Sequence, residues 1–167
     1  MPSWADDLAI GNRMINARGE TVQEKPTFRR LMASQRCLVP ATGFYEWKKT
    51  SKVKQPYLFT LTGSEVFGMA GLWDRWTGSG DQIIESYTIL TTRPNEVAGA
   101  SHDRMPVIIA PADYETWLDA TASLAQVNDL IKPFDGEPMT VTPVSTLVNS
   151  PANDKPECIE HRHSASG

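Results

Sequence analysis

The fold is decided in the middle of the chain, where residues 43–92 read GFYEWKKTSKVKQPYLFTLTGSEVFGMAGLWDRWTGSGDQIIESYTILTT. Aromatic, β-branched and charged residues mix here in a way that is typical of strands. We predict four strands from this stretch, at 43–49, 55–63, 65–76 and 85–92. The short segment TGS separates the second strand from the third.

The flanking sequence adds further strands and a few helices. Strands or extended chain are predicted at 36–40, 106–110 and 139–148. Apolar residues at helical spacing predict helices at 26–35, 111–120 and 123–134. Many strands with few helices indicate an α+β fold built around a mostly antiparallel β-sheet. The chain has neither the strand–helix alternation and GxGxxG loop of a doubly wound nucleotide-binding fold nor a P-loop.

Length and composition are those of a globular domain. The chain has 167 residues and a mass of 18.5 kDa, with 40% hydrophobic and 22% charged residues. No apolar run approaches the roughly 20 residues of a membrane-spanning helix, and the start, MPSWADDLAI, lacks the regions of a secretory signal. Two cysteines, Cys37 and Cys158, without a CxxC or HExxH motif, exclude a disulfide framework and a Cys-rich zinc module. We expect a cytoplasmic protein with no metal, no cofactor and no membrane association.

The net charge of −4 conceals an uneven distribution. Residues 25–54 contain eight basic residues and one acidic residue, Glu46, which gives this stretch a net charge of +7. Such a patch attracts a polyanion, because charges further away are screened at physiological ionic strength. Lysines on a solvated loop that serve only solubility are the alternative explanation.

The first candidate site segment is MINARGET at 14–21. In a strand, Asn16, Arg18 and Glu20 would point to one face, because alternate residues share a side. That face is either exposed to solvent or the wall of a polar site. An arginine beside an asparagine is suited to a phosphate, because a guanidinium donates two parallel hydrogen bonds.

Two further segments, TGFYEWKK at 42–49 and SHDRMP at 101–106, contain candidate proton-transfer groups. Glu46 lies between two aromatic residues, which can desolvate the carboxyl and raise its pKa. An edge-strand glutamate paired with Lys48 is the alternative. His102 is one of three histidines, and it lies in a loop before an apolar strand, where functional residues are common. A lone histidine is nevertheless more often a structural, hydrogen-bonded residue.

Taken together and in this order, the motifs resemble the SOS-response-associated peptidase (SRAP) family, the abasic-site processing proteins. They are NAR-x-ET at 16–21, GFYEWKK at 43–49, HDRMP at 102–106 and PVS-x-x-VN at 143–149. The opening PSWA also resembles a segment of this family, and its Trp4 is a candidate for stacking on DNA. The resemblance predicts a single domain over residues 2–156, followed by a disordered tail at 157–167.

The resemblance implies a barrel-like sheet with flanking helices, and it implies covalent capture of abasic sites in single-stranded DNA. In this family a cysteine at the start of the mature chain supplies an amine and a thiol, which condense with the sugar aldehyde to a thiazolidine. By position, Glu46 would assist the proton transfers and His102 would promote opening of the sugar ring. Both groups suit such roles, because imidazoles titrate near neutral pH and a desolvated carboxyl holds its proton more tightly. Asn16, Arg18 and Arg104 would contact the DNA.

The sequence departs from the family pattern at its start, which reads Met1-Pro2-Ser3 where the family has a cysteine after the initiator methionine. We expect that the segment with this cysteine is missing from the sequence, so that the chain binds single strands weakly and forms no stable crosslink. We expect a monomer whose partner is single-stranded DNA containing abasic sites. Two alternative functions are a self-processing peptidase and a non-catalytic single-stranded DNA-binding module.

Overall fold

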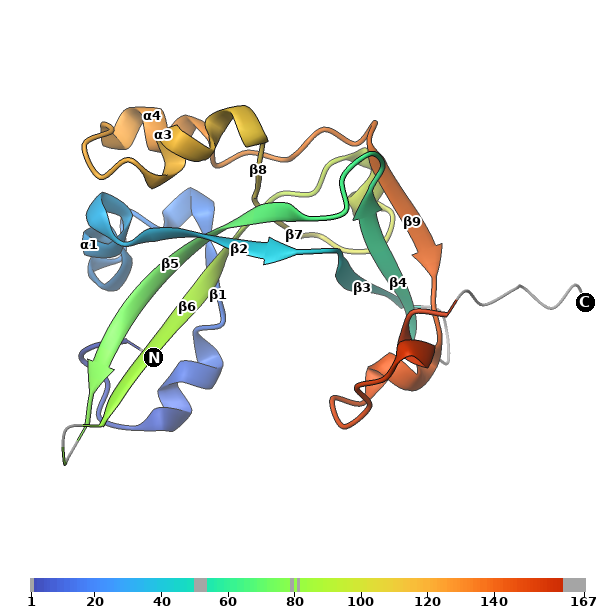
Figure 1. Cartoon of the computed structure of the whole chain (residues 1–167), viewed down its shortest axis with the longest axis horizontal. Helices are drawn as coiled ribbons and strands as arrows, with labels where there is room; N and C mark the ends of the chain where they lie inside the picture. The colour runs from blue at the N-terminus through green and yellow to red at the C-terminus, as the bar shows by residue number, and fades with distance from the viewer. Residues whose placement is uncertain (1, 50–53, 79, 81, 161–167) are drawn as a thin grey trace, which may run out of the picture.

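The computed structural model describes residues 2–49, 54–78, 80 and 82–160, and it confirms the predicted α+β class (Figure 1). One sheet, here sheet A, has the strand order β1-β6-β5-β2, with β7 added beside β6 and β8 beside β5. Its strands are β1 (Asn16–Arg18), β2 (Arg36–Ala41), β5 (Phe67–Thr77), β6 (Ile83–Thr92), β7 (Met105–Pro106) and β8 (Ile108–Ile109). The second sheet, sheet B, has the order β3-β4-β9. Its strands are β3 (Phe44–Lys49), β4 (Lys54–Leu61) and β9 (Met139–Pro143).

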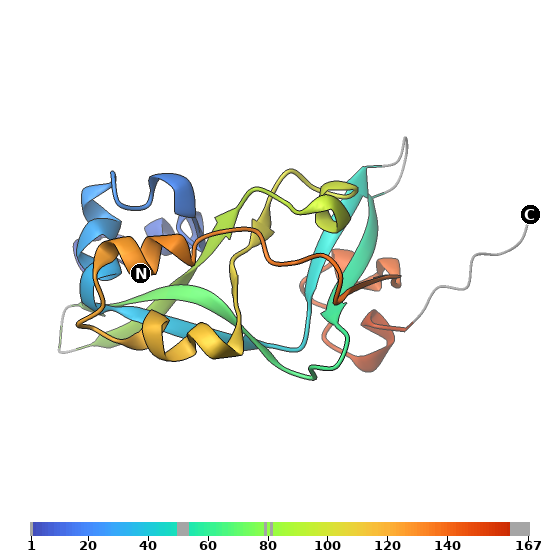
Figure 2. The same cartoon turned by 90° about the horizontal axis from the view of Figure 1, so that it is seen from above.

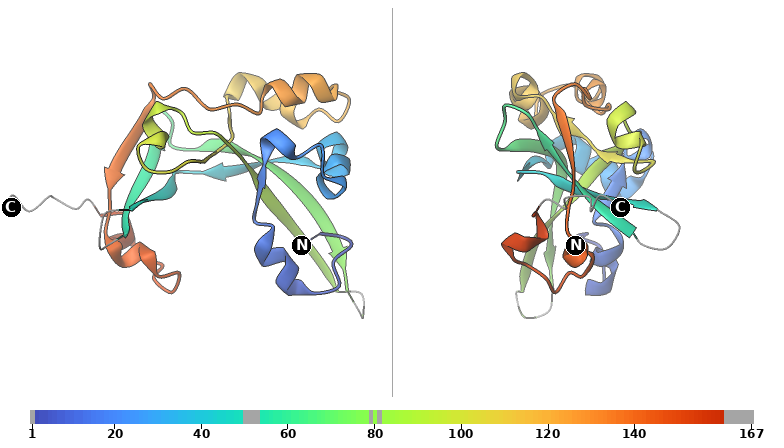
Figure 3. Two further views of the ribbon diagram at one scale, coloured as in Figure 1. Left: turned by 180° about the vertical axis from the view of Figure 1, so that it is seen from behind. Right: turned by 90° about the vertical axis from the view of Figure 1, so that its right-hand side faces the viewer.

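The strand pairing is antiparallel except between β1 and β6, which are parallel. Sheet A curls like half a barrel, and sheet B stands at the far end of the molecule (Figures 1 and 2). The α-helices are α1 (Pro26–Ser34), α2 (Glu96–Gly99), α3 (Tyr114–Leu118) and α4 (Leu124–Asp129). Short 3-10 turns are η1 (Leu8–Arg13), η2 (Gly19–Thr21), η4 (Pro111–Asp113), η5 (Thr146–Asn149) and η6 (Pro156–Cys158). The last two lie at the end of sheet B that is remote from the helices (Figure 3).

Several predicted elements are shorter than the sequence pattern indicated. The helix expected at 111–120 is divided between the 3-10 turn η4 and α3, and the strand expected at 106–110 is divided between β7 and β8. The helix expected at 123–134 begins with a capping box at Ser123 but ends at Asp129, because the next amides bond three residues back, as in a 3-10 turn, and Pro133 follows. The extended chain expected at 139–148 ends as a strand at Pro143. The Ser145 side chain then accepts a hydrogen bond from the Leu147 amide and begins η5. Residues 161–167 of the predicted tail lie outside the described residues, and Cys158 is buried.

Three apolar clusters hold these layers together. The largest packs Phe28, Leu31 and Met32 of α1 against one face of sheet A and against Trp117 of α3. The other two clusters join the sheets, with Phe44 of β3 packed in both of them. Phe44 stacks on Phe59 with ring centroids 4.9 Å apart. The position of β3 relative to sheet A is therefore fixed by buried apolar contact.

Arg36 corrects one expectation about the basic stretch. It was counted with the surface patch at 25–54, but its side chain is buried, with only 7% of the residue exposed. The guanidinium donates to main-chain carbonyls at the ends of α1 and α3, those of Met32, Ala33, Trp117 and Asp119. The Asp119 carbonyl also accepts from the Ala122 amide. The other three lie at helix ends, where intrahelical donors are lacking, so the arginine satisfies them. Arg36 therefore supports the fold and cannot attract a polyanion.

We predict that Arg36→Met lowers the free energy of unfolding by about 2 to 4 kcal/mol, because several buried carbonyls lose their donor while the stem volume is kept. The measurement is urea denaturation followed by circular dichroism. The matched control is Arg75→Met, since Arg75 is exposed and faces Glu85 at 3.5 Å, and its loss should change stability by less than ~0.5 kcal/mol. Equal effects of the two substitutions would contradict the assigned role of Arg36.

Candidate functional site

The residues predicted for the site meet at one cavity between the two sheets. Its volume is about 550 Å³, within the usual range for ligand sites. The walls come from β1, β2, β3, β5, β6 and the segment before β7. Five of the six candidate residues line it: Asn16, Arg18, Glu46, His102 and Arg104. The sequence segments at 14–21, 42–49 and 101–106 therefore converge in space.

Asn16 and Arg18 project from β1, which pairs in parallel with residues 89–91 near the end of β6. Both are exposed whereas Ala17 between them is buried, as the alternation of a strand requires. Glu20 does not continue this face, and the prediction that it lies on the strand is wrong. The chain leaves the sheet at Gly19, where a Cβ would lie 2.2 Å from the Ile131 Cγ2 atom, and it enters the 3-10 turn η2.

Glu46 occupies the middle of β3, opposite Tyr57 of β4. Its side chain is mostly enclosed, with 18% exposed. Burial raises the pKa of the Glu46 carboxyl above its usual range, although the nearby His102 imidazole and the Trp47 main chain act in the opposite direction. The pairing with Lys48 that the sequence left open is not what shifts this group. A carboxyl of this kind takes up and releases a proton more readily near neutral pH than an exposed glutamate does.

His102 follows α2 and lies against Glu46. Its Nδ1 atom is 3.8 Å from Glu46 Oε2, which is close enough for an electrostatic interaction and too long for a hydrogen bond. The same nitrogen is 3.2 Å from Asp103 Oδ1 and accepts a hydrogen bond from the Arg104 amide, also at 3.2 Å. In the neutral imidazole this leaves the hydrogen on Nε2. The side chain is 45% exposed, so it can be reached from solvent.

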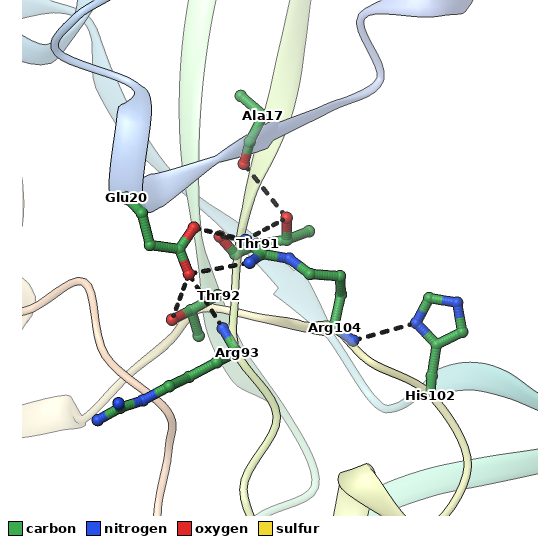
Figure 4. Close-up of polar contacts among 7 residues, drawn as sticks. All are labelled: Ala17, Glu20, Thr91, Thr92, Arg93, His102 and Arg104. Atoms are coloured by element: carbon green, nitrogen blue, oxygen red, sulfur yellow. Dashed lines mark hydrogen bonds and ion pairs between the residues drawn. The ribbon is translucent and has the colours of Figure 1, made fainter.

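Arg104 is held by Glu20, as Figure 4 shows. Nη1 donates to Glu20 Oε1 at 2.9 Å and Nη2 to Glu20 Oε2 at 2.8 Å. The Arg104 guanidinium lowers the pKa of Glu20 to about 2. Glu20 was grouped with Asn16 and Arg18 from the sequence, but its pairing with Arg104 was not predicted, because the two residues are 84 positions apart.

Other candidate residues lie elsewhere. Trp4 is exposed and lines a separate hollow together with Trp76, so its stacking role stays a prediction. Asn149 of the fourth motif accepts a hydrogen bond from Trp47 Nε1 at 2.6 Å and donates to the Lys54 carbonyl at 3.2 Å. It therefore connects η5 to β3 and β4.

The described residues include no group of three or more His, Cys, Asp or Glu side chains placed to hold a metal ion. Within the same part of the chain, no helix is long and apolar enough to cross a membrane. Burial raises the pKa of the Cys37 thiol, which disfavours the reactive thiolate. Neither Cys37 nor Cys158 lines the cavity. The ionisable side chains that line the cavity are those of Arg18, Tyr45, Glu46, His102 and Arg104.

We predict that Glu20→Gln lowers stability at pH 7 by ~1 kcal/mol, a value reduced for the solvent around the half-exposed carboxylate. The folded-state pKa of Glu20 is depressed from 4.5 to about 2, so the pair stabilises the protein above pH 4.5 and loses this contribution as the pH falls toward 2. Urea denaturation at several pH values should therefore show a gap between parent and variant that closes in acid. A gap that stays constant down to pH 2 would refute the assignment.

Comparison with known proteins identifies relatives over nearly the whole chain. The chain is 43% identical over 162 residues to the abasic site processing protein YoqW of Bacillus subtilis, which covers 96% of the chain and 72% of the relative. It is 32% identical over 183 residues to the abasic site processing protein HMCES of Xenopus tropicalis, covering 95% of the chain and 54% of the relative.

A crystal structure of a protein from Bacteroides thetaiotaomicron superposes with a TM-score of 0.88 at 31% identity, over 97% of this chain and 73% of that one. The family model described as SOS response associated peptidase (SRAP) matches residues 1–151. The chain therefore belongs to the SRAP family.

Proposed function

We propose that the cavity binds an abasic site in single-stranded DNA and that Glu46 and His102 carry out proton transfers on the exposed sugar. Relatives named abasic site processing proteins support this proposal, in bacteria and in vertebrates. The observation that carries it is the proximity of Glu46 and His102. A desolvated carboxyl and an accessible imidazole lie 3.8 Å apart in a cavity that an arginine and an asparagine also line.

The chemistry of an abasic sugar requires both a proton donor and a proton acceptor. The sugar rests as a cyclic hemiacetal, and it opens when the bond between C1′ and the ring oxygen breaks. A base removes the proton from the C1′ hydroxyl and an acid delivers one to the ring oxygen, which yields an aldehyde and a C4′ hydroxyl. The accessible His102 imidazole and the buried Glu46 carboxyl beside it supply the base and the acid for this step. Glu46 also suits the proton transfers that follow.

The aldehyde is then open to condensation with an aminothiol. The nitrogen and the sulfur each form a bond to the aldehyde carbon, whose oxygen leaves as water after it has been protonated. By the family resemblance, a cysteine at the start of the mature chain supplies both atoms. Within residues 2–160, Glu46 and His102 are the groups that prepare and protonate the sugar.

The strand is held by its phosphates in this proposal. Arg18 and Asn16 lie side by side on the exposed face of β1 at the edge of the cavity. A guanidinium and an amide can together donate several hydrogen bonds to one phosphate group. Because base edges are not needed for such contacts, binding should depend little on sequence.

The acid–base roles can be tested with the chain as it is. An abasic oligonucleotide is mixed with excess protein and a saturating aminooxy probe, which traps each aldehyde as an oxime, so that ring opening limits the rate. We expect the protein to accelerate labelling. Because general acid–base catalysis contributes on the order of 100-fold, Glu46→Gln and His102→Ala should remove most of the acceleration without changing affinity.

Two outcomes would contradict this prediction. If the parent binds the oligonucleotide without accelerating labelling, the chain is a binding module. If Glu46→Gln and His102→Ala label as fast as the parent, the residues are wrongly assigned. Exposed Glu65, changed to Gln, is a suitable control for the loss of a carboxylate.

Phosphate binding is tested separately. Arg18→Ala should weaken binding of abasic single strands by ~1 to 3 kcal/mol, because a charge-assisted hydrogen bond is lost. The dependence of affinity on salt should also become shallower, since fewer counterions are released. Fluorescence anisotropy at several salt concentrations measures both quantities. Parent-like affinity and salt slope would exclude Arg18 from the interface.

A further inference from the structure

We propose that Glu20 and Arg104 are positioning residues, whose ion pair fixes the main chain at Arg104 so that its amide holds the His102 imidazole beside Glu46. The role in the reaction rests on the proposed function. Figure 4 shows the contacts of Glu20, Arg104 and His102 on which the geometry rests.

The Arg104 guanidinium already has hydrogen-bond partners within the protein. Its two terminal nitrogens form parallel bonds with both oxygens of Glu20, at 2.9 and 2.8 Å. Nη2 also donates to the Thr91 carbonyl at 2.5 Å and approaches Thr91 Oγ1 at 3.2 Å. Its Nε is buried and has no hydrogen-bond partner among the described residues. The two terminal nitrogens that a guanidinium uses for a paired contact are therefore occupied by Glu20, while Arg104 still lines the cavity.

Glu20 connects three segments that are distant in the sequence. It lies in η2 directly after β1, and its Oε1 accepts a hydrogen bond from the Arg93 amide at the end of β6, at 3.2 Å. Thr92 Oγ1 lies 3.5 Å from the same oxygen. Through Arg104 the carboxylate also holds the segment that precedes β7. One side chain therefore fixes the loop at 101–104 to two strands of sheet A.

The Glu20–Arg104 ion pair, which we call the clamp, is linked to the imidazole by a main-chain hydrogen bond. The Arg104 amide donates to His102 Nδ1 at 3.2 Å, and His102 Nδ1 lies 3.8 Å from Glu46 Oε2. The imidazole is nearly half exposed, so packing alone leaves it room to rotate. Release of Arg104 would free the donor that orients this ring.

The test separates positioning from DNA contact by measuring affinity and rate independently. For Glu20→Gln and Arg104→Gln we expect the labelling rate at saturating protein to fall about tenfold or more, because a small misplacement of a catalytic group is costly. In Glu20→Gln, which leaves the arginine in place, affinity for the abasic oligonucleotide should stay within about twofold. The labelling rate of the double variant should be no lower than that of the slower single variant, as expected of residues that act as a unit. Glu24→Gln, which removes a nearby exposed carboxylate, is the control.

The opposite pattern overturns the proposal. A tenfold loss of affinity in Arg104→Gln with an unchanged rate at saturation would make Arg104 a strand contact. A parent-like rate in Glu20→Gln would show that the ion pair does not position His102. Thermal unfolding establishes whether the variants are folded. If Arg104→Gln does not fold, the rate and affinity of the isosteric Glu20→Gln alone test the positioning role.

A second measurement needs no DNA. Amide hydrogen exchange followed by NMR should show the Arg104 amide exchanging about tenfold faster in Glu20→Gln than in the parent or in Glu24→Gln, because opening of the clamp frees it. If the parent does not accelerate labelling, the proposed function is refuted. The exchange rate of the Arg104 amide then still tests whether the Glu20–Arg104 ion pair fixes this main-chain segment. Unchanged exchange would refute the clamp whatever the DNA assays show.

Discussion

The approach of the Glu46 carboxyl to the His102 imidazole is the interaction on which the rest of the site depends. Glu46 belongs to sheet B and His102 to a loop at the edge of sheet A. They meet because Phe44, on the same face of β3 as Glu46, packs into the apolar clusters that join the two sheets. The same packing desolvates the carboxyl and raises its pKa. Apolar burial thus creates both the contact and the altered acidity.

Three arginines illustrate how one residue type serves different purposes in this fold. Arg36 is buried and satisfies carbonyls at two helix ends. Arg104 is bound on two sides by a carboxylate and a strand carbonyl at the edge of the cavity. Arg18 is exposed at the mouth of the same cavity. A count of positive charge along the sequence cannot separate these roles, because each depends on which acceptors the fold brings near.

Local patterns in the sequence predicted what local physics determines. Alternation predicted that Asn16 and Arg18 share a face, and the mixed aromatic stretches predicted the strands of both sheets. The position of Glu20 in η2, away from the face of β1, could not be predicted in this way. The chain turns where Gly19 packs against Ile131, which is distant in the sequence. Burial of Arg36 depends likewise on carbonyls from α3. The convergence of Glu46 and His102 was expected only from the order of motifs, since periodicity carries no information on the distance between sheets.

The most direct measurement of the central claim is a structure of the chain bound to a single-stranded oligonucleotide with a tetrahydrofuran in place of the abasic sugar. The account predicts the analogue inside the cavity, within hydrogen-bond reach of Glu46 and His102, with a neighbouring phosphate on Arg18. An oligonucleotide bound at another surface, such as the hollow beside Trp4, with the cavity free of the strand, would contradict it.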